Sequence, residues 1–81
     1  MKKAMTYFEK CLEIKNKHYG EMNIECAITY ENIGNTHSDK GDFKKSFTNY
    51  EKSLEIKIQL FGEIHINCAI TYENIGSILF D

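Results

Sequence analysis

The sequence predicts an all-α fold in which four antiparallel helices form stacked helix-turn-helix repeats, and internal repetition is the main reason. Residues 1–39 align without a gap on residues 43–81, an offset of 42 residues, and the nine residues 26–34 recur letter for letter as residues 68–76. Apolar side chains recur every three or four residues, which is the spacing of one helix face. A period between about 20 and 50 residues indicates stacked units that bury their apolar faces against one another.

The first and third helices are expected at residues 1–19 and about 43–60. Large apolar side chains form one stripe along the third helix, at Phe43, Phe47, Tyr50 and Leu54. The first helix carries the same stripe at Met1, Met5, Phe8 and Leu12. A glycine follows each helix, Gly20 or Gly62, and glycine suits the left-handed conformation that ends many helices.

The second and fourth helices are expected at about 25–40 and 67–81. The inward stripe of the second helix consists of Tyr30, Ile33, Gly34 and His37. Gly41 is expected to end this helix and Asp42 to cap the next, while Asn23 and Asn67 mark the other boundaries. We interpret residues 1–81 as one segment of a longer array. It would hold the second helix of a preceding repeat (1–19), a complete helix pair (25–60) and the first helix of a following repeat (67–81).

Composition argues against several classes of function. The formal net charge is −2 and arginine is absent, which disfavours nucleic-acid binding. No apolar run approaches the roughly 20 residues that span a bilayer, and the N-terminal residues lack the apolar stretch of a signal peptide. We therefore expect a cytoplasmic protein without a membrane segment.

The cysteines and histidines do not form a pattern typical of a metal site or a catalytic site. Cys11, Cys26 and Cys68 are widely spaced, and we expect them to be reduced and buried, with no metal or cofactor. Cys26, His37 and Asp39 lie on different helical faces, and the second copy has leucine at the place of His37. We do not expect an enzyme.

The stripe of the second helix resembles the tetratricopeptide repeat, because Tyr30, Ile33, Gly34 and His37 occupy its aromatic, leucine, glycine and tyrosine places. Ser46, Tyr50 and Ser53 then match its small and aromatic places in the following helix. The usual repeat has about 34 residues, whereas this period of 42 resembles the longer variety of kinesin light chains and nephrocystin-type proteins. The resemblance implies a right-handed α-solenoid that acts as a protein-interaction scaffold.

A second face of the same helices is the candidate binding site. It carries Ile28, Glu31, Asn32, Asn35 and Asp39 in the first copy and Ile70, Glu73, Asn74, Ser77 and Asp81 in the second. The resemblance implies that this stripe lies in the concave groove and that Asn32 and Asn74 match the groove asparagines of the family. We expect Asn32, Asn74, Glu31, Glu73, Asn35 and Ser77 to contact an extended peptide or a partner helix.

The expected ligand is a neutral or basic peptide. Glu31 and Glu73 directly precede the two asparagines, where the family members that clamp a peptide carboxylate have lysines nearby. Two alternatives stay open at this stage. The stripe can be an ordinary solvated face, or the chain can associate mainly with adjacent repeats or with itself through uncapped helical ends.

Overall fold

The computed structural model describes residues 2–20 and 22–80, and within them the chain is an all-α fold of four helices. The helices are α1 (Lys2–Tyr19), α2 (Ile24–Asp39), α3 (Phe43–Phe61) and α4 (Ile66–Phe80). The described residues contain no strand, so the predicted fold class is confirmed. Met1 and Asp81, which were expected in the first and last helices, lie outside the described residues, as does the side chain of Met5.

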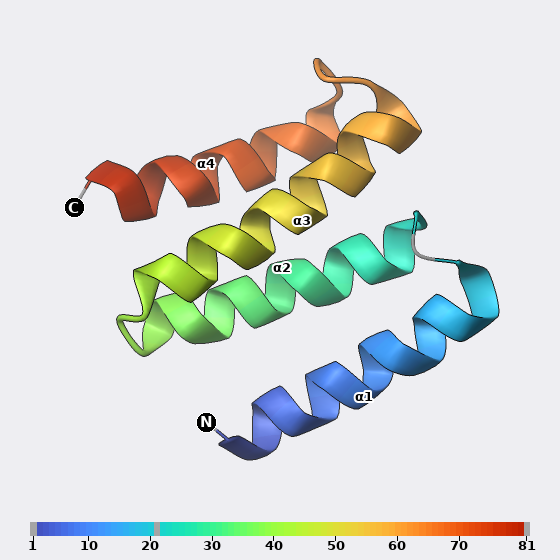
Figure 1. Cartoon of the computed structure of the whole chain (residues 1–81). Helices are drawn as coiled ribbons and strands as arrows, with labels where there is room; N and C mark the ends of the chain where they lie inside the picture. Colours follow the sequence, from blue (N-terminus) through green and yellow to red (C-terminus); the bar gives the residue numbers. More distant parts are fainter. Residues whose placement is uncertain (1, 21, 81) are drawn as a thin grey trace.

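The four helices lie side by side in chain order and alternate in direction, with α1 and α4 at the two edges (Figure 1). Each helix packs against the next along the chain. The molecule measures 36 × 34 × 14 Å, so it is flattened along one axis. In such a stack a helix is covered on both sides only when it has a neighbour on each side.

Glycines and short polar side chains set the helix ends as expected. Gly20, Gly41 and Gly62 all have positive φ angles, between 80° and 91°, which a side chain would disfavour. Asn23 caps α2 by accepting a hydrogen bond from the backbone N–H of Cys26. Asp42 likewise accepts from the N–H of Lys45 and caps α3.

Asn67 marks the start of the fourth helix to within one residue, as expected, but it lies inside α4, which begins at Ile66, and so does not cap it. His65 takes the capping role instead, because its Nδ1 accepts a hydrogen bond from the backbone N–H of Asn67 at 3.0 Å. His65 stands 42 residues after Asn23, so the same place in the repeat uses a different polar side chain.

The core forms where α1, α2 and α3 meet. Its fully buried centre is Cys26, Ala27 and Ile56, and partly buried apolar side chains pack around it, namely Leu12, Ile24 and Tyr30. Cys68 is also buried, whereas Cys11 is only partly so. The expectation of buried cysteines is therefore confirmed for two of the three.

Gly34 allows α2 and α3 to approach closely. A Cβ placed at Gly34 would lie 2.6 Å from the ring of Tyr50, so no larger residue fits there without movement. Ser46 adds a hydrogen bond from its Oγ to the carbonyl oxygen of Gly34 at 2.9 Å. Its counterpart Gly76, 42 residues later, differs, because a Cβ there would meet no described atom within 4 Å.

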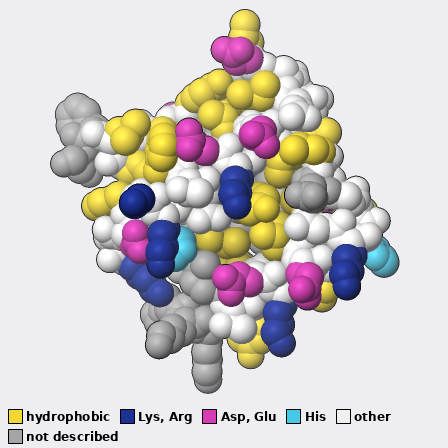
Figure 2. Space-filling model, in the orientation of Figure 1, with side chains coloured by type: hydrophobic (Ala, Val, Ile, Leu, Met, Phe, Trp, Pro, Cys, Tyr) yellow, Lys and Arg dark blue, Asp and Glu magenta, His cyan; other side chains and the backbone are white. Residues whose placement is uncertain are grey.

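Much apolar surface stays uncovered. Figure 2 shows hydrophobic side chains in several patches on one face, with acidic and lysine side chains between them. Among the most exposed apolar residues are Ile14, Ile66, Ile70 and Leu79. None of the described helices is long and apolar enough to cross a membrane.

Candidate functional site

The six side chains expected to bind a peptide lie on α2 and α4, but in different environments. Four are exposed, namely Asn32, Asn35, Glu73 and Ser77. Asn74 is half-buried, and Glu31 is buried with only 9% of its surface exposed. The structure brings Glu31 and Asn74 into direct contact.

Glu31 is the centre of a polar cluster that joins three helices. Its Oε1 accepts hydrogen bonds from Ser53 Oγ at 2.8 Å and from Thr71 Oγ1 at 2.9 Å, and lies 3.5 Å from Lys57 Nζ. Its Oε2 accepts from Asn74 Nδ2 at 2.6 Å. Lys57 also donates to Thr71 Oγ1 at 2.8 Å. We call these five residues the Glu31 cluster; it links α2 to α3 and α4.

The energetics of the Glu31 cluster follow from its burial. Lys57 is 7% exposed, and Ser53 and Thr71 are fully buried. A buried charge is tolerated only when it is paired and its remaining hydrogen-bonding capacity is used. Glu31 supplies the paired charge that the buried Lys57 needs. Four groups donate to or pair with the two carboxylate oxygens of Glu31. The cluster therefore fixes the position of α4 relative to α2.

The expectation that Glu31 lies on an open surface stripe is wrong. Its carboxylate points between the helices, because Ser53 and Lys57 of α3 and Thr71 of α4 hold it there. Sequence reasoning missed the roles of Ser53, Lys57 and Thr71. The sequence did contain one signal for a buried ion pair. Lys57 lies seven residues after Tyr50 and four after Ser53, so it shares the inward face of the third helix, where an unpaired lysine would be costly.

A partial counterpart of the Glu31 cluster lies one repeat earlier. Lys15 stands 42 residues before Lys57, and its Nζ donates to Thr29 Oγ1 at 3.3 Å, as Lys57 does to Thr71. Lys15 also pairs with Glu25 at 3.1 Å. Burial lowers the pKa of Lys15, but Glu25 and the neighbouring Cys11 together outweigh it, so the pKa is raised above its usual 10.5.

Asn35 contacts the protein itself. Its Oδ1 accepts a hydrogen bond from the hydroxyl of Tyr50 at 2.5 Å. Burial raises the pKa of Tyr50 above 10.0, and the negative charges of Glu31 and Asp39 raise it further, although a hydrogen bond with Ser46 acts in the opposite direction. Tyr50 is therefore held in its neutral form, in which it can donate to Asn35.

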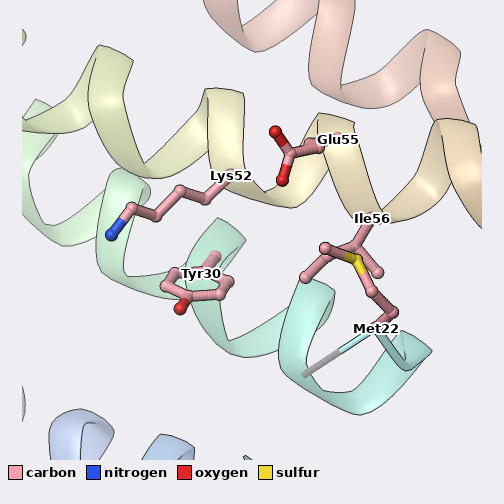
Figure 3. Close-up of a pocket in the computed structure, with 5 residues that line it drawn as sticks. All are labelled: Met22, Tyr30, Lys52, Glu55 and Ile56. Carbon is pink, nitrogen blue, oxygen red and sulfur yellow. The ribbon is translucent and has the colours of Figure 1, made fainter. Parts of the chain in front are cut away.

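A small pocket lies between α2, α3 and the connection that follows α1 (Figure 3). Its volume is about 140 Å³ and its lining is Met22, Tyr30, Lys52, Glu55 and Ile56. The Lys52 ammonium lies 5.5 Å from the centre of the Tyr30 ring, within the range of a cation–π interaction. Small-molecule sites usually measure roughly 300 to 1,000 Å³, so this pocket is too small for one.

The described residues contain no group of three or more histidine, cysteine, aspartate or glutamate side chains placed to hold a metal ion. Cys26, the thiol considered with His37 and Asp39 in the sequence, is fully buried. Its Sγ donates to Asn16 Oδ1 at 2.8 Å.

Comparison with known proteins identifies a family. A family model described as tetratricopeptide repeat matches residues 25–81, and a second model with the same description matches residues 1–18. No curated protein matches the chain, and no solved structure does.

Proposed function

The chain belongs to the tetratricopeptide repeat family, and from this premise we propose that it is a scaffold segment that binds an extended peptide or a partner helix on the α2–α4 face. Repeats of this family are protein-interaction modules. We further propose that the 42-residue period places the chain with the longer repeats of kinesin light chains and nephrocystin-type proteins. Exposed polar side chains on both helices support peptide binding, namely Asn32 and Asn35 on α2 and Glu73 and Ser77 on α4.

The position of the asparagines carries the proposal. The bond from Asn74 to Glu31 brings neighbouring positions of α2 and α4 into contact, which supports a shared binding face. Asn32 is exposed on α2, and the Oδ1 of Asn74 has no hydrogen bond from the described residues. An amide both donates and accepts, so it can pair with the backbone of an extended peptide whatever its side chains.

The charge of this face favours a neutral or basic ligand. The described parts of α2 and α4 contain no lysine, so these two helices supply no lysine for a peptide carboxylate. Lys57 compensates Glu31, whereas Glu73 and Asp39 are exposed. The preference for a basic peptide therefore rests on Glu73 and Asp39, whose attraction acts over a Debye length of roughly 8 Å at physiological salt.

Replacing Asn32 and Asn74 together with alanine tests the proposal. A peptide selected from a random library on the wild-type chain should bind the double variant about tenfold more weakly or worse, since each lost hydrogen bond costs about 0.5 to 1.5 kcal/mol. Calorimetry measures the affinity, and circular dichroism checks that the helices persist.

Asn49 provides the matched control, because it is an amide on α3 whose Nδ2 donates to the Lys45 carbonyl one turn earlier. Asn49→Ala should leave peptide affinity unchanged. If the double variant also keeps its affinity, the face is an ordinary solvated surface and peptide binding is refuted.

A further inference from the structure

We infer that His65 is a pH-sensitive link between α3 and α4, which holds the first turn of α4 while its imidazole is neutral and releases that turn in mildly acidic solution. The link lies in the connection between the two helices, at residues 62–65. It uses none of the side chains proposed to bind a peptide, so the inference does not depend on that proposal.

The hydrogen bond from Asn67 fixes the protonation state of His65. A backbone N–H can only donate, so the Nδ1 that lies 3.0 Å from the Asn67 nitrogen has to carry a lone pair and no proton. The ring proton of neutral His65 is therefore on Nε2. A proton on Nδ1 would place two donors against each other, so the cap exists only while His65 is neutral.

The second contact of the His65 ring is with α3. The rings of His65 and Phe61 stack, with their centroids 4.6 Å apart and an angle of 24° between their planes. The stack suits both charge states of His65, because an aromatic face also attracts a cation. The ring thus joins the last residue of α3 to the first turn of α4, and only the contact with α4 requires the neutral form.

The position of His65 differs from that of the other two histidines. The N-terminus of a helix is the positive end of its dipole, so an imidazolium directly before α4 is unfavourable. His18 and His37 lie in the last turns of α1 and α2, where the same dipole favours a positive charge. Acid should therefore weaken a helix end at His65 and favour the helix ends at His18 and His37.

The titratable side chains that line the same hollow as His65 are Glu63 of the connection and Tyr72 of α4. Within the part of the chain that the structure describes, neither forms a hydrogen bond or an ion pair with His65. From α3 the ring meets Phe61, which carries no charge. Glu63 is exposed, and the attraction between exposed charges is weaker than a helix cap. The loss of the cap therefore decides the effect of acid.

The first hairpin has a cap that does not respond to pH. Asn23 stands 42 residues before His65 and caps α2, and its amide does not titrate near neutrality. A histidine that is bonded only when neutral contributes stability that is complete above its unfolded pKa, about 6.5, and is lost as the pH falls below that value. Mild acid should therefore loosen the start of α4 and leave the start of α2 unchanged.

Amide exchange followed by NMR on the whole chain tests the link. The exchange rate in the first turn of α4 is divided by the rate in the first turn of α2, each normalised to the unfolded chain at the same pH. Between about pH 7.5 and about pH 5 this ratio should rise on the order of three- to tenfold, as expected when a helix loses its cap. The Nδ1 chemical shift of His65 should report protonation over the same range.

His65→Asn is the decisive variant, because it gives α4 the kind of cap that α2 has. Its exchange ratio should stay constant across the same pH range. A chain with His18→Gln and His37→Gln together is the matched control, since it keeps His65 as its one histidine. This control should show the full wild-type change.

A wild-type ratio that is constant with pH would overturn the inference, and so would a His65→Asn chain that still responds. Loss of the response in the control would assign it to another histidine, with the same consequence. A proton on Nδ1 in the neutral wild-type ring would exclude the hydrogen bond from Asn67 and refute the link directly.

Discussion

The same nine residues occur in α2 and α4, and the two copies have different environments. Glu31 is buried and Glu73 exposed; Gly34 contacts Tyr50 and Gly76 faces open space. Ile33 is 4% exposed, whereas its counterpart Ile75 is only half-buried. Identical sequence therefore does not give identical burial, and the neighbouring helices decide which residues belong to the core.

The residues that agree between the copies show which neighbours matter. Cys26 and Cys68 are both fully buried, and Thr29 and Thr71 each have at most 3% of their surface exposed. These side chains face the helix that precedes them, and both copies have one, α1 or α3. Tyrosine, glutamate and glycine of the repeated segment face the helix that follows, and among the described residues only α2 has such a neighbour.

The largest difference between the copies is expected for the glutamates. Glu31→Ala leaves Lys57 buried without its carboxylate, and breaking a buried ion pair in this way costs about 3 to 5 kcal/mol. Glu73→Ala removes an exposed side chain and should change stability by less than about 0.5 kcal/mol. Urea unfolding followed by circular dichroism, in dilute solution, measures both.

Glu31→Gln is a second, milder variant for the case that Glu31→Ala unfolds completely. A chain of this size has a stability of roughly 4 to 12 kcal/mol, so the expected loss is a large part of it. Glutamine keeps one acceptor and should fold with an intermediate loss. Equal losses for Glu31→Ala and Glu73→Ala would contradict the structural role of the Glu31 cluster.

The glycines should respond in opposite directions. Gly34→Ala forces a Cβ to within 2.6 Å of the Tyr50 ring, and overpacking of this kind costs about 1 to 3 kcal/mol, partly offset by the helix preference of alanine. Gly76→Ala meets no described atom within 4 Å and should stabilise α4 by about 0.5 to 1 kcal/mol. Thermal unfolding of the pair distinguishes the signs, and two shifts in the same direction would contradict the close approach at Gly34.

A smaller effect is expected from Tyr50 in alkaline solution. Its pKa is raised in the folded chain, first by burial, so the unfolded chain ionises more readily. The stability that Tyr50 contributes is complete below pH 10, the usual pKa, and is lost as pH rises through the folded pKa. Tyr50→Phe makes this place resemble Phe8, and its stability should fall less steeply above pH 10. Parallel stability curves for the two proteins would refute the assignment.

The sequence was sufficient for the fold because its signals are local. The spacing of Phe43, Phe47 and Tyr50 defines a helix face, and Gly41 with Asp42 marks a turn whatever lies nearby. The repeat then implies how helices stack. His65 was overlooked as a cap because histidine is not among the usual capping residues, and Asn67 nearby looked more suitable.

The candidate site was less predictable because burial is a property of neighbours. Glu31 and Glu73 have the same flanking sequence, and a helical wheel places both on one surface. Only the position of Ser53 and Lys57 on α3 shows that one of them is enclosed. Whether Asn32, Asn74 and Ser77 contact a peptide stays a prediction.

The two fully buried thiols give this chain a built-in means of following local unfolding. Cys26 lies where α2 begins and Cys68 where α4 begins, with each Sγ near a carbonyl oxygen of the preceding glycine, at 3.7 Å and 3.5 Å. A shielded thiol reacts with an alkylating reagent only when its surroundings open. The alkylation rate of Cys26 therefore reports on the α1–α2 hairpin, and that of Cys68 on the α3–α4 hairpin. Neither reporter has to be engineered into the protein.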